Sequence, residues 1–129
     1  MKNSVLVDTS IWIAYFNQPE SKYGAALEKL IIEDQAVYAG IVLAELLQGA
    51  KVEKEFNQIQ KNFNVLPYLE TYQKIWLAVG VLSYSLRKKG ITLPISDIIL
   101  ACLAQENNCR IFSLDQHFEM IPKISMFQV

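Results

Sequence analysis

The fold is decided near the start of the chain by residues 5–13, VLVDTSIWI. The first three are apolar and mostly β-branched, which favours a buried β-strand. This strand should end at Asp8, and Thr9 or Ser10 can cap the helix that follows, expected over residues 11–17. A strand that leads through a polar turn into a helix is the repeating unit of α/β proteins. The stretch therefore predicts an α/β fold with an acid at the carboxyl end of its first strand.

The same alternation of short apolar runs and helical patterns continues along the chain. No repeat, low-complexity stretch or linker interrupts it, so we expect one domain spanning residues 1–129. The pattern predicts an α/β domain with a mostly parallel sheet of four to five strands, flanked by helices. Further helices are predicted over residues 21–34, 41–48, 52–63, 71–89 and 95–106, and further strands over residues 36–38, 64–66, 110–113 and 125–127.

The composition is that of a folded chain without a membrane span. Hydrophobic residues make up 52% of the 129 residues and charged residues 19%, which is too apolar for a disordered chain. No apolar run reaches the roughly 18 residues that a membrane helix needs. The apolar stretch before Asp8 is too short for a signal peptide. We therefore expect a soluble, cytoplasmic protein.

Cysteine and histidine are too scarce for a structural zinc site. The chain has two cysteines, Cys102 and Cys109, and a single histidine, His117. A structural zinc site takes four such ligands. Any bound metal must therefore be held by oxygen atoms, which is typical of magnesium, manganese and calcium.

Some of the thirteen acids stand in strongly apolar surroundings. Glu45 is the only charge in residues 41–47, IVLAELL, and Asp97 interrupts residues 93–100, LPISDIIL. A buried carboxylate needs a partner, a proton or a cation. Ligands of parallel sheets bind beyond the carboxyl ends of the strands, where two more acids are expected. The candidate catalytic and metal-binding residues are Asp8, Glu45, Asp97 and Asp115.

Each acid also has an ordinary structural explanation. Asp97 could simply complement the dipole at the start of its helix. Asp8 and Asp115 could be caps or turn formers. Glu45 is harder to explain in this way, because a charge among apolar residues of a helix needs an ion pair or an interface. The four explanations would have to hold together, so we favour a common cation site.

Four short motifs of this sequence resemble those of the PIN-domain nucleases. They occur in the family's order over the whole chain, and the chain length is similar to that of the VapC toxins of toxin–antitoxin pairs. No single motif is specific, but the set of four is. The motifs are VDTS at residues 7–10, ELLQG at residues 45–49, ISDIILA at residues 95–101 and SLDQHF at residues 113–118.

The resemblance implies a Rossmann-like PIN fold and a Mg²⁺- or Mn²⁺-dependent endoribonuclease. It also implies a homodimer that is inhibited by a cognate antitoxin protein. The four candidate acids fall on the family's acidic positions, so the resemblance does not predict an inactive copy. Thr9, Ser10 and Ser113 fall on hydroxyl positions that support the acids, with serine at 113 where threonine is more usual.

Basic residues give a weaker indication of RNA binding. The net charge is −1, so no overall positive field attracts nucleic acid. The candidates for phosphate contact are Arg87, Lys88 and Lys89, together with Lys51. A solvated helix end explains these side chains equally well. His117 is not needed as a general base if a metal activates the water, so no role is predicted for it.

Two other functions fit parts of the pattern. An aspartyl phosphatase also has an acid after its first strand, but it needs a second acid two residues on, where this chain has Ser10. The main alternative is a non-catalytic interaction module on the PIN fold, binding RNA or protein without cleavage. Binding of a divalent cation distinguishes the enzyme from this alternative.

Overall fold

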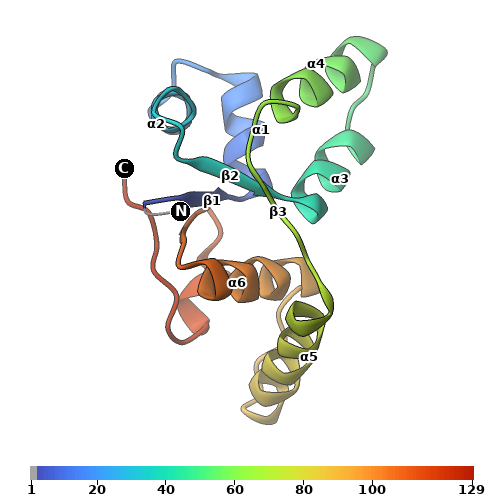
Figure 1. Cartoon of the computed structure of the whole chain (residues 1–129), viewed down its shortest axis with the longest axis vertical. Coiled ribbons are helices and arrows are strands. Elements are labelled where there is room, and N and C mark those ends of the chain that lie inside the picture. Colours follow the sequence, from blue (N-terminus) through green and yellow to red (C-terminus); the bar gives the residue numbers. More distant parts are fainter. Residues whose placement is uncertain (1–2) are drawn as a thin grey trace.

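Short strands and helices alternate along residues 3–129, the part of the chain that the computed structural model describes (Figure 1). The predicted α/β organisation is confirmed. A 3₁₀ helix, Gln116–Met120, follows the last strand. The elements are β1 Val5–Val7, α1 Thr9–Asn17, α2 Lys22–Ile32, β2 Ala36–Ala39, α3 Gly40–Gln48, α4 Glu53–Phe63, β3 Tyr68–Leu69, α5 Gln73–Lys88, α6 Ile95–Asn107 and β4 Arg110–Phe112.

The strands form one parallel sheet of four in the order β3-β2-β1-β4. β1 pairs with β2 on one side and with β4 on the other, so that Leu6 is opposite both Val37 and Ile111. In Figure 1, α1 to α4 lie above the strands, and α6 and α5 lie below them. Covered on both faces, a parallel strand is apolar throughout rather than alternating. This is why all three residues of β1 are fully buried.

The core lies between the sheet and its two helical layers. Trp12 of α1 is fully buried on one side of the sheet, and the α6 segment 97–104 is buried on the other. Burial of nearly a whole helix explains why α6 is apolar around most of its circumference. Within residues 3–129, no helix is both long enough and apolar enough to cross a membrane.

The third strand was predicted four residues too early. Residues 64–66 form the turn that ends α4: Asn64 is the C-cap of the helix, and the Leu66 amide donates a turn hydrogen bond to the Phe63 carbonyl. Pairing with β2 begins only after this turn, where the Tyr38 amide donates to the Pro67 carbonyl. The prediction for residues 64–66 was therefore wrong, and β3 is Tyr68–Leu69.

The strand predicted over residues 125–127 is reduced to a single parallel bridge between Met126 and Ile111. The predicted cap of α1 was also wrong. Asp8 occupies the N-cap position without a side-chain cap hydrogen bond, and the helix already begins at Thr9. The hydroxyl groups of Thr9 and Ser10 are thereby free to bind carboxylates instead of the helix end.

Candidate active site

Polar side chains meet where β1 and β4 end side by side. Asp8 follows β1 directly, and its amide donates a hydrogen bond of 2.9 Å to the carbonyl of Phe112, the last residue of β4. Ser113 and Asp115 follow β4, and Asp97 lies in the first turn of α6. The pairing of two parallel strands therefore gathers residues that lie up to about a hundred positions apart in sequence.

The Asp8 carboxylate is held by two hydroxyl groups. Ser10 and Ser113 both donate to Asp8 Oδ2, at 2.9 and 2.7 Å. Each hydroxyl also accepts from the backbone: Ser10 Oγ from the Leu114 amide at 3.0 Å, and Ser113 Oγ from the Asp115 amide at 2.9 Å. These bonds fix one oxygen of Asp8, and among residues 3–129 none engages the other. The Asp8 carboxylate is therefore held in one orientation, and its Oδ1 atom has no hydrogen bond within residues 3–129 and could bind a ligand. The residue is nevertheless only 8% exposed.

Asp97, Asp115 and His117 form the tightest cluster, because one potential ligand atom of each lies within 4.8 Å of those of the other two. The His117 Nδ1 atom lies 2.7 Å from Asp97 Oδ2 and 3.0 Å from Asp115 Oδ1. The His117 amide also donates to Asp115 Oδ1 at 2.9 Å. Asp115 is thereby the N-cap of the 3₁₀ helix, which turns the histidine ring back toward the strand ends.

The pKa values of Asp97 and His117 reflect burial, hydrogen bonding and nearby negative charge. Burial raises the pKa of Asp97, and the carboxylates of Asp115 and Asp8 raise it further, whereas the hydrogen bond to His117 lowers it. The pKa of His117 is raised, first by its hydrogen bond to Asp97 and then by the charge of Asp115. Without a metal ion, the site therefore holds a proton on its histidine more strongly than a free imidazole does.

Glu45 lies at the edge of the cluster. It projects from α3, and its Oε1 atom accepts a hydrogen bond of 2.8 Å from Thr9 Oγ1. Because Thr9 follows Asp8 in the chain, this bond connects α3 to the acidic residues at the end of β1. Glu45 is not one of the three residues with ligand atoms within 4.8 Å of one another.

The donor set of the site suits a hard divalent cation. No lysine or arginine in the described part of the chain forms an ion pair with any of the four candidate acids. Carboxylate oxygens are the preferred ligands of Mg²⁺ and Mn²⁺, and a histidine nitrogen is compatible with Mn²⁺. A cation would relieve the repulsion that raises the pKa of Asp97. The residues that could hold it are Asp8, Asp97 and Asp115, with Glu45 and His117 beside them.

His117 is the residue of the site for which the sequence predicted no role. Its side chain is 39% exposed, and it lies in the mixed segment DQHFEM of residues 115–120 rather than in a strongly apolar segment such as residues 93–100 around Asp97. The only available signal was its distance of two residues from Asp115, which is the spacing of an N-cap hydrogen bond.

The predicted RNA-binding residues are not gathered at this site. Arg87 and Lys88 lie in the last turn of α5 and Lys89 is its C-cap. Figure 1 shows that end of α5 pointing away from the sheet. The Lys88 ammonium lies 5.3 Å from the ring centroid of Tyr84. Lys51 lines a groove of about 550 Å³ between α1, α3 and α4, and Glu45 lies in the same groove.

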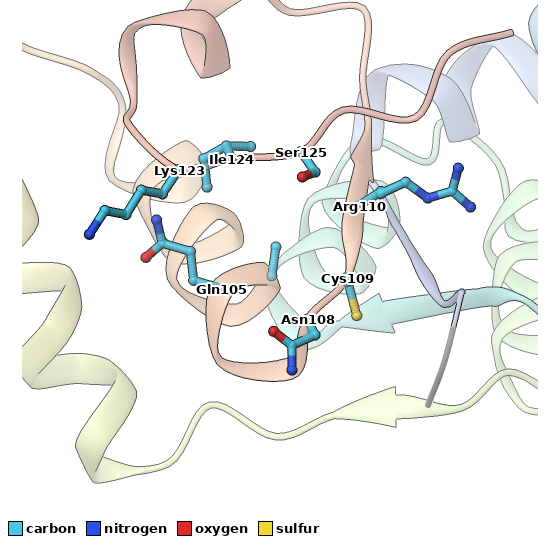
Figure 2. Close-up of a pocket in the computed structure, with 8 residues that line it drawn as sticks. Gln105, Asn108, Cys109, Arg110, Lys123, Ile124 and Ser125 are labelled. Atoms are coloured by element: carbon cyan, nitrogen blue, oxygen red, sulfur yellow. The ribbon is translucent and has the colours of Figure 1, made fainter.

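A second cavity, of about 440 Å³, lies at the opposite end of β4 from the acidic cluster (Figure 2). It is bounded by the end of α6 and by residues 123–125. In Figure 2 the charged ends of Arg110 and Lys123 point away from each other. A binding site needs polar groups that converge, so this cavity is not the candidate site.

Comparison with known proteins agrees with this geometry. The family model described as PIN domain matches residues 5–124. The chain is 29% identical over 128 residues to ribonuclease VapC11 of Mycobacterium tuberculosis, covering 96% of each chain. It is 26% identical over 124 residues to ribonuclease VapC2 of Rickettsia felis, covering 92% of each.

Solved structures of low sequence identity share the fold. DNA-bound VapBC from Salmonella typhimurium matches with a TM-score of 0.82 at 21% identity, over 96% of each chain. A toxin–antitoxin complex from Klebsiella pneumoniae matches with a TM-score of 0.77 at 21% identity, over 98% of this chain and 100% of that one.

Proposed function

Because this chain belongs to the PIN domain family, we propose that it is a metal-dependent endoribonuclease and the toxin of a VapBC-type pair. One observation carries the proposal: Asp8, Asp97 and Asp115 come together at the carboxyl edge of the sheet, without a lysine or arginine partner among the described residues. The relatives named as VapC ribonucleases align over nearly the whole chain, which supports the same activity here.

The proposed cofactor is Mg²⁺ or Mn²⁺, held by Asp8, Asp97 and Asp115. A divalent ion at such a site supplies an activated water and offsets the charge of the scissile phosphate. Ser10 and Ser113 would keep the free oxygen of Asp8 directed at the ion, because both bind its other oxygen. Glu45 would be a further ligand or would orient the attacking water, and Thr9 holds its carboxylate in place.

The antitoxin is proposed to dock in the groove between α1, α3 and α4. The Klebsiella pneumoniae relative was solved as a toxin–antitoxin complex. The groove of this chain is lined by apolar residues that include Ile13, Phe16 and Leu46, as recognition of an amphipathic helix requires. Glu45 lies in the groove, so an occupant would cover one of the acids. Ile13→Glu should abolish capture of the antitoxin and leave cleavage unchanged.

The activity is tested by incubating the purified protein with total cellular RNA, with Mg²⁺, with Mn²⁺ or with excess chelator. Fragments should appear only with a divalent ion, and mapping their ends should reveal discrete cleavage sites. Asp97→Asn should abolish cleavage while the far-ultraviolet circular dichroism remains that of the wild type. Asp34→Asn is the matched control, since Asp34 is exposed and has a left-handed backbone that asparagine tolerates.

Equal cleavage by Asp97→Asn and the wild type would contradict the assignment of the acids. Absence of both cleavage and calorimetric binding of Mg²⁺ or Mn²⁺ would favour the alternative, an interaction module on the PIN fold that binds RNA or protein without cutting it.

A further inference from the structure

A small cleft borders the acidic cluster on the side of α2. Its volume is about 200 Å³, and it lies between the first turn of α2, the residues that follow β4 and the segment 127–129. Ser113 belongs to both features: it lines the cleft, and its hydroxyl donates to Asp8 Oδ2 at 2.7 Å. Leu114, the next residue of the wall, is anchored through its amide to Ser10 Oγ. A ligand in the cleft would therefore lie beside the candidate metal site.

The size of the cleft restricts its ligand. Pockets for drug-sized molecules measure roughly 300–1,000 Å³, so 200 Å³ has room for only one small planar group. The walls come from three segments of the chain, and the ring of Tyr23 lies beside that of Phe112, with 6.4 Å between the ring centroids. An α-helix of a partner protein, about 10 Å across, is too wide to enter.

The chemistry of the walls is that of nucleotide recognition. Lys22 is the one charged side chain among the lining residues; it forms no ion pair within residues 3–129, and its Nζ atom lies 5.7 Å from the Tyr23 ring centroid. Within residues 3–129, neither the Tyr23 hydroxyl nor the side-chain amide of Gln128 forms a hydrogen bond with another group of the protein. Proteins that read single-stranded RNA combine these three elements: a cation for phosphate, an aromatic ring for stacking and a polar group for the base edge.

We propose that this cleft binds one nucleotide of the RNA substrate, next to the phosphodiester that is cut. The base lies against Tyr23, the Gln128 amide contacts its edge, and Lys22 contacts its phosphate. The inference rests on the proposed ribonuclease activity, which makes RNA the substrate. It adds the residues that determine which phosphodiester is cut. The basic residues at the end of α5, Arg87, Lys88 and Lys89, are not part of this nucleotide site.

Binding is measured in an Asp97→Asn background, so that RNA stays intact, by fluorescence anisotropy with a labelled single-stranded RNA of mixed sequence. Lys22→Ala should weaken binding and reduce the slope of log affinity against log salt by about 0.7, the value for one phosphate contact on a single strand. Tyr23→Leu should weaken binding at least about fivefold through lost stacking, and Tyr23→Phe by less. Lys29→Ala, an exposed lysine of the same helix, is the matched control and should change neither quantity.

Specificity is measured by mapping fragment ends from a degenerate RNA cut by the wild type and by Gln128→Ala. The variant should lose the base preference at one position flanking the cut and keep its preferences elsewhere. The cleft proposal is overturned if Lys22→Ala, Tyr23→Leu and Gln128→Ala all match Lys29→Ala while the wild type cleaves RNA. If the wild type does not cleave RNA and Lys22→Ala still lowers affinity and salt slope, RNA binding by the cleft is supported, and both the nuclease proposal and the placement beside a cleaved phosphodiester fail.

Discussion

At the scale of single residues, the site depends on a few hydrogen bonds that bring carboxylates together. The sequence predicted Asp8 and Asp97 because a charge between apolar neighbours needs a special explanation. It predicted no role for His117, whose position depends on the turn after β4 and on the Asp115 cap. Turns of this kind are determined by tertiary contacts, such as the bond from the Leu114 amide to Ser10, which neighbouring residues do not encode.

Ser113→Ala removes one of the two donors to Asp8 Oδ2 and leaves the other in place. The loss should reduce metal affinity and cleavage rate by about 10- to 100-fold, the usual effect of removing a residue that orients a ligand. Isothermal titration with Mn²⁺ and single-turnover cleavage measure the two effects. Ser125→Ala, at an exposed serine beside the distant cavity, is the control. Equal losses in both variants would show that Ser113 does not position Asp8.

The raised pKa of His117 makes the metal-free protein sensitive to pH. The contact of Nδ1 with Asp97 holds the folded-state pKa above the ordinary 6.5. The stabilisation that the protonated ring contributes is complete below 6.5 and is lost as the pH rises through the folded-state value. Urea unfolding of the wild type with chelator should therefore show stability that falls as the pH rises above 6.5. His117→Asn should fall less steeply, and parallel curves for the two proteins would refute this account.

At the scale of elements, the helices and the three strands β1, β2 and β4 were predictable, and β3 was not. Helices α5 and α6 carry several turns of periodic sequence, and their predicted ranges agree with the structure to within two residues at each end. β3 has two residues, which is too few to show any alternation, so its position depends on pairing with β2. Ser21 was predicted to open α2 and does so as its N-cap, accepting a hydrogen bond from the Gly24 amide.

Gly24 allows the chain to turn tightly into α2. A Cβ atom at this position would lie 2.6 Å from the carbonyl oxygens of both Gln18 and Pro19, which are backbone atoms and cannot move aside easily. Helix propensity alone would make Gly24→Ala stabilising by about 0.8–1 kcal/mol. Because of the clash, we expect the opposite sign, a loss of about 1–3 kcal/mol. Chemical unfolding decides between the two signs, and Lys29→Ala on the exposed side of the same helix should change stability by less than about 0.5 kcal/mol.

At the scale of the whole molecule, the outer face of α5 is an exposed apolar surface without an assigned role. Four apolar side chains at helical spacing are more than half exposed: Trp76 at 53%, Leu77 at 71%, Val81 at 57% and Tyr84 at 63%. Gly80 lies among them, and a Cβ atom there would meet nothing within 4 Å. An exposed apolar helix face of this size marks an interaction surface. We propose that α5 is the face through which two copies of the chain pack in the predicted homodimer.

Leu77→Glu places a charge in the middle of this face and should convert a dimer into a monomer in sedimentation velocity runs at micromolar concentration. Ile32→Glu introduces the same charge at an apolar residue of α2 that is 75% exposed and lies off the face, and it should leave the dimer intact. A monomeric wild type, or a dimer that survives Leu77→Glu, would remove α5 as the dimer face.

The hydrogen bond between Ser113 and Asp8 joins residues 105 positions apart, and it has a consequence for synthesis on the ribosome. The first strand emerges before all of the helices, whereas its neighbour β4 and the acid after it are made only after α6. Folding during translation proceeds from the amino terminus, so most of the helices can pack before these residues leave the exit tunnel. A nascent chain, or one cut short by a premature stop, thus lacks a complete set of acids. The proposed nuclease activity would therefore appear in the cell only after β4 and Asp115 have been made.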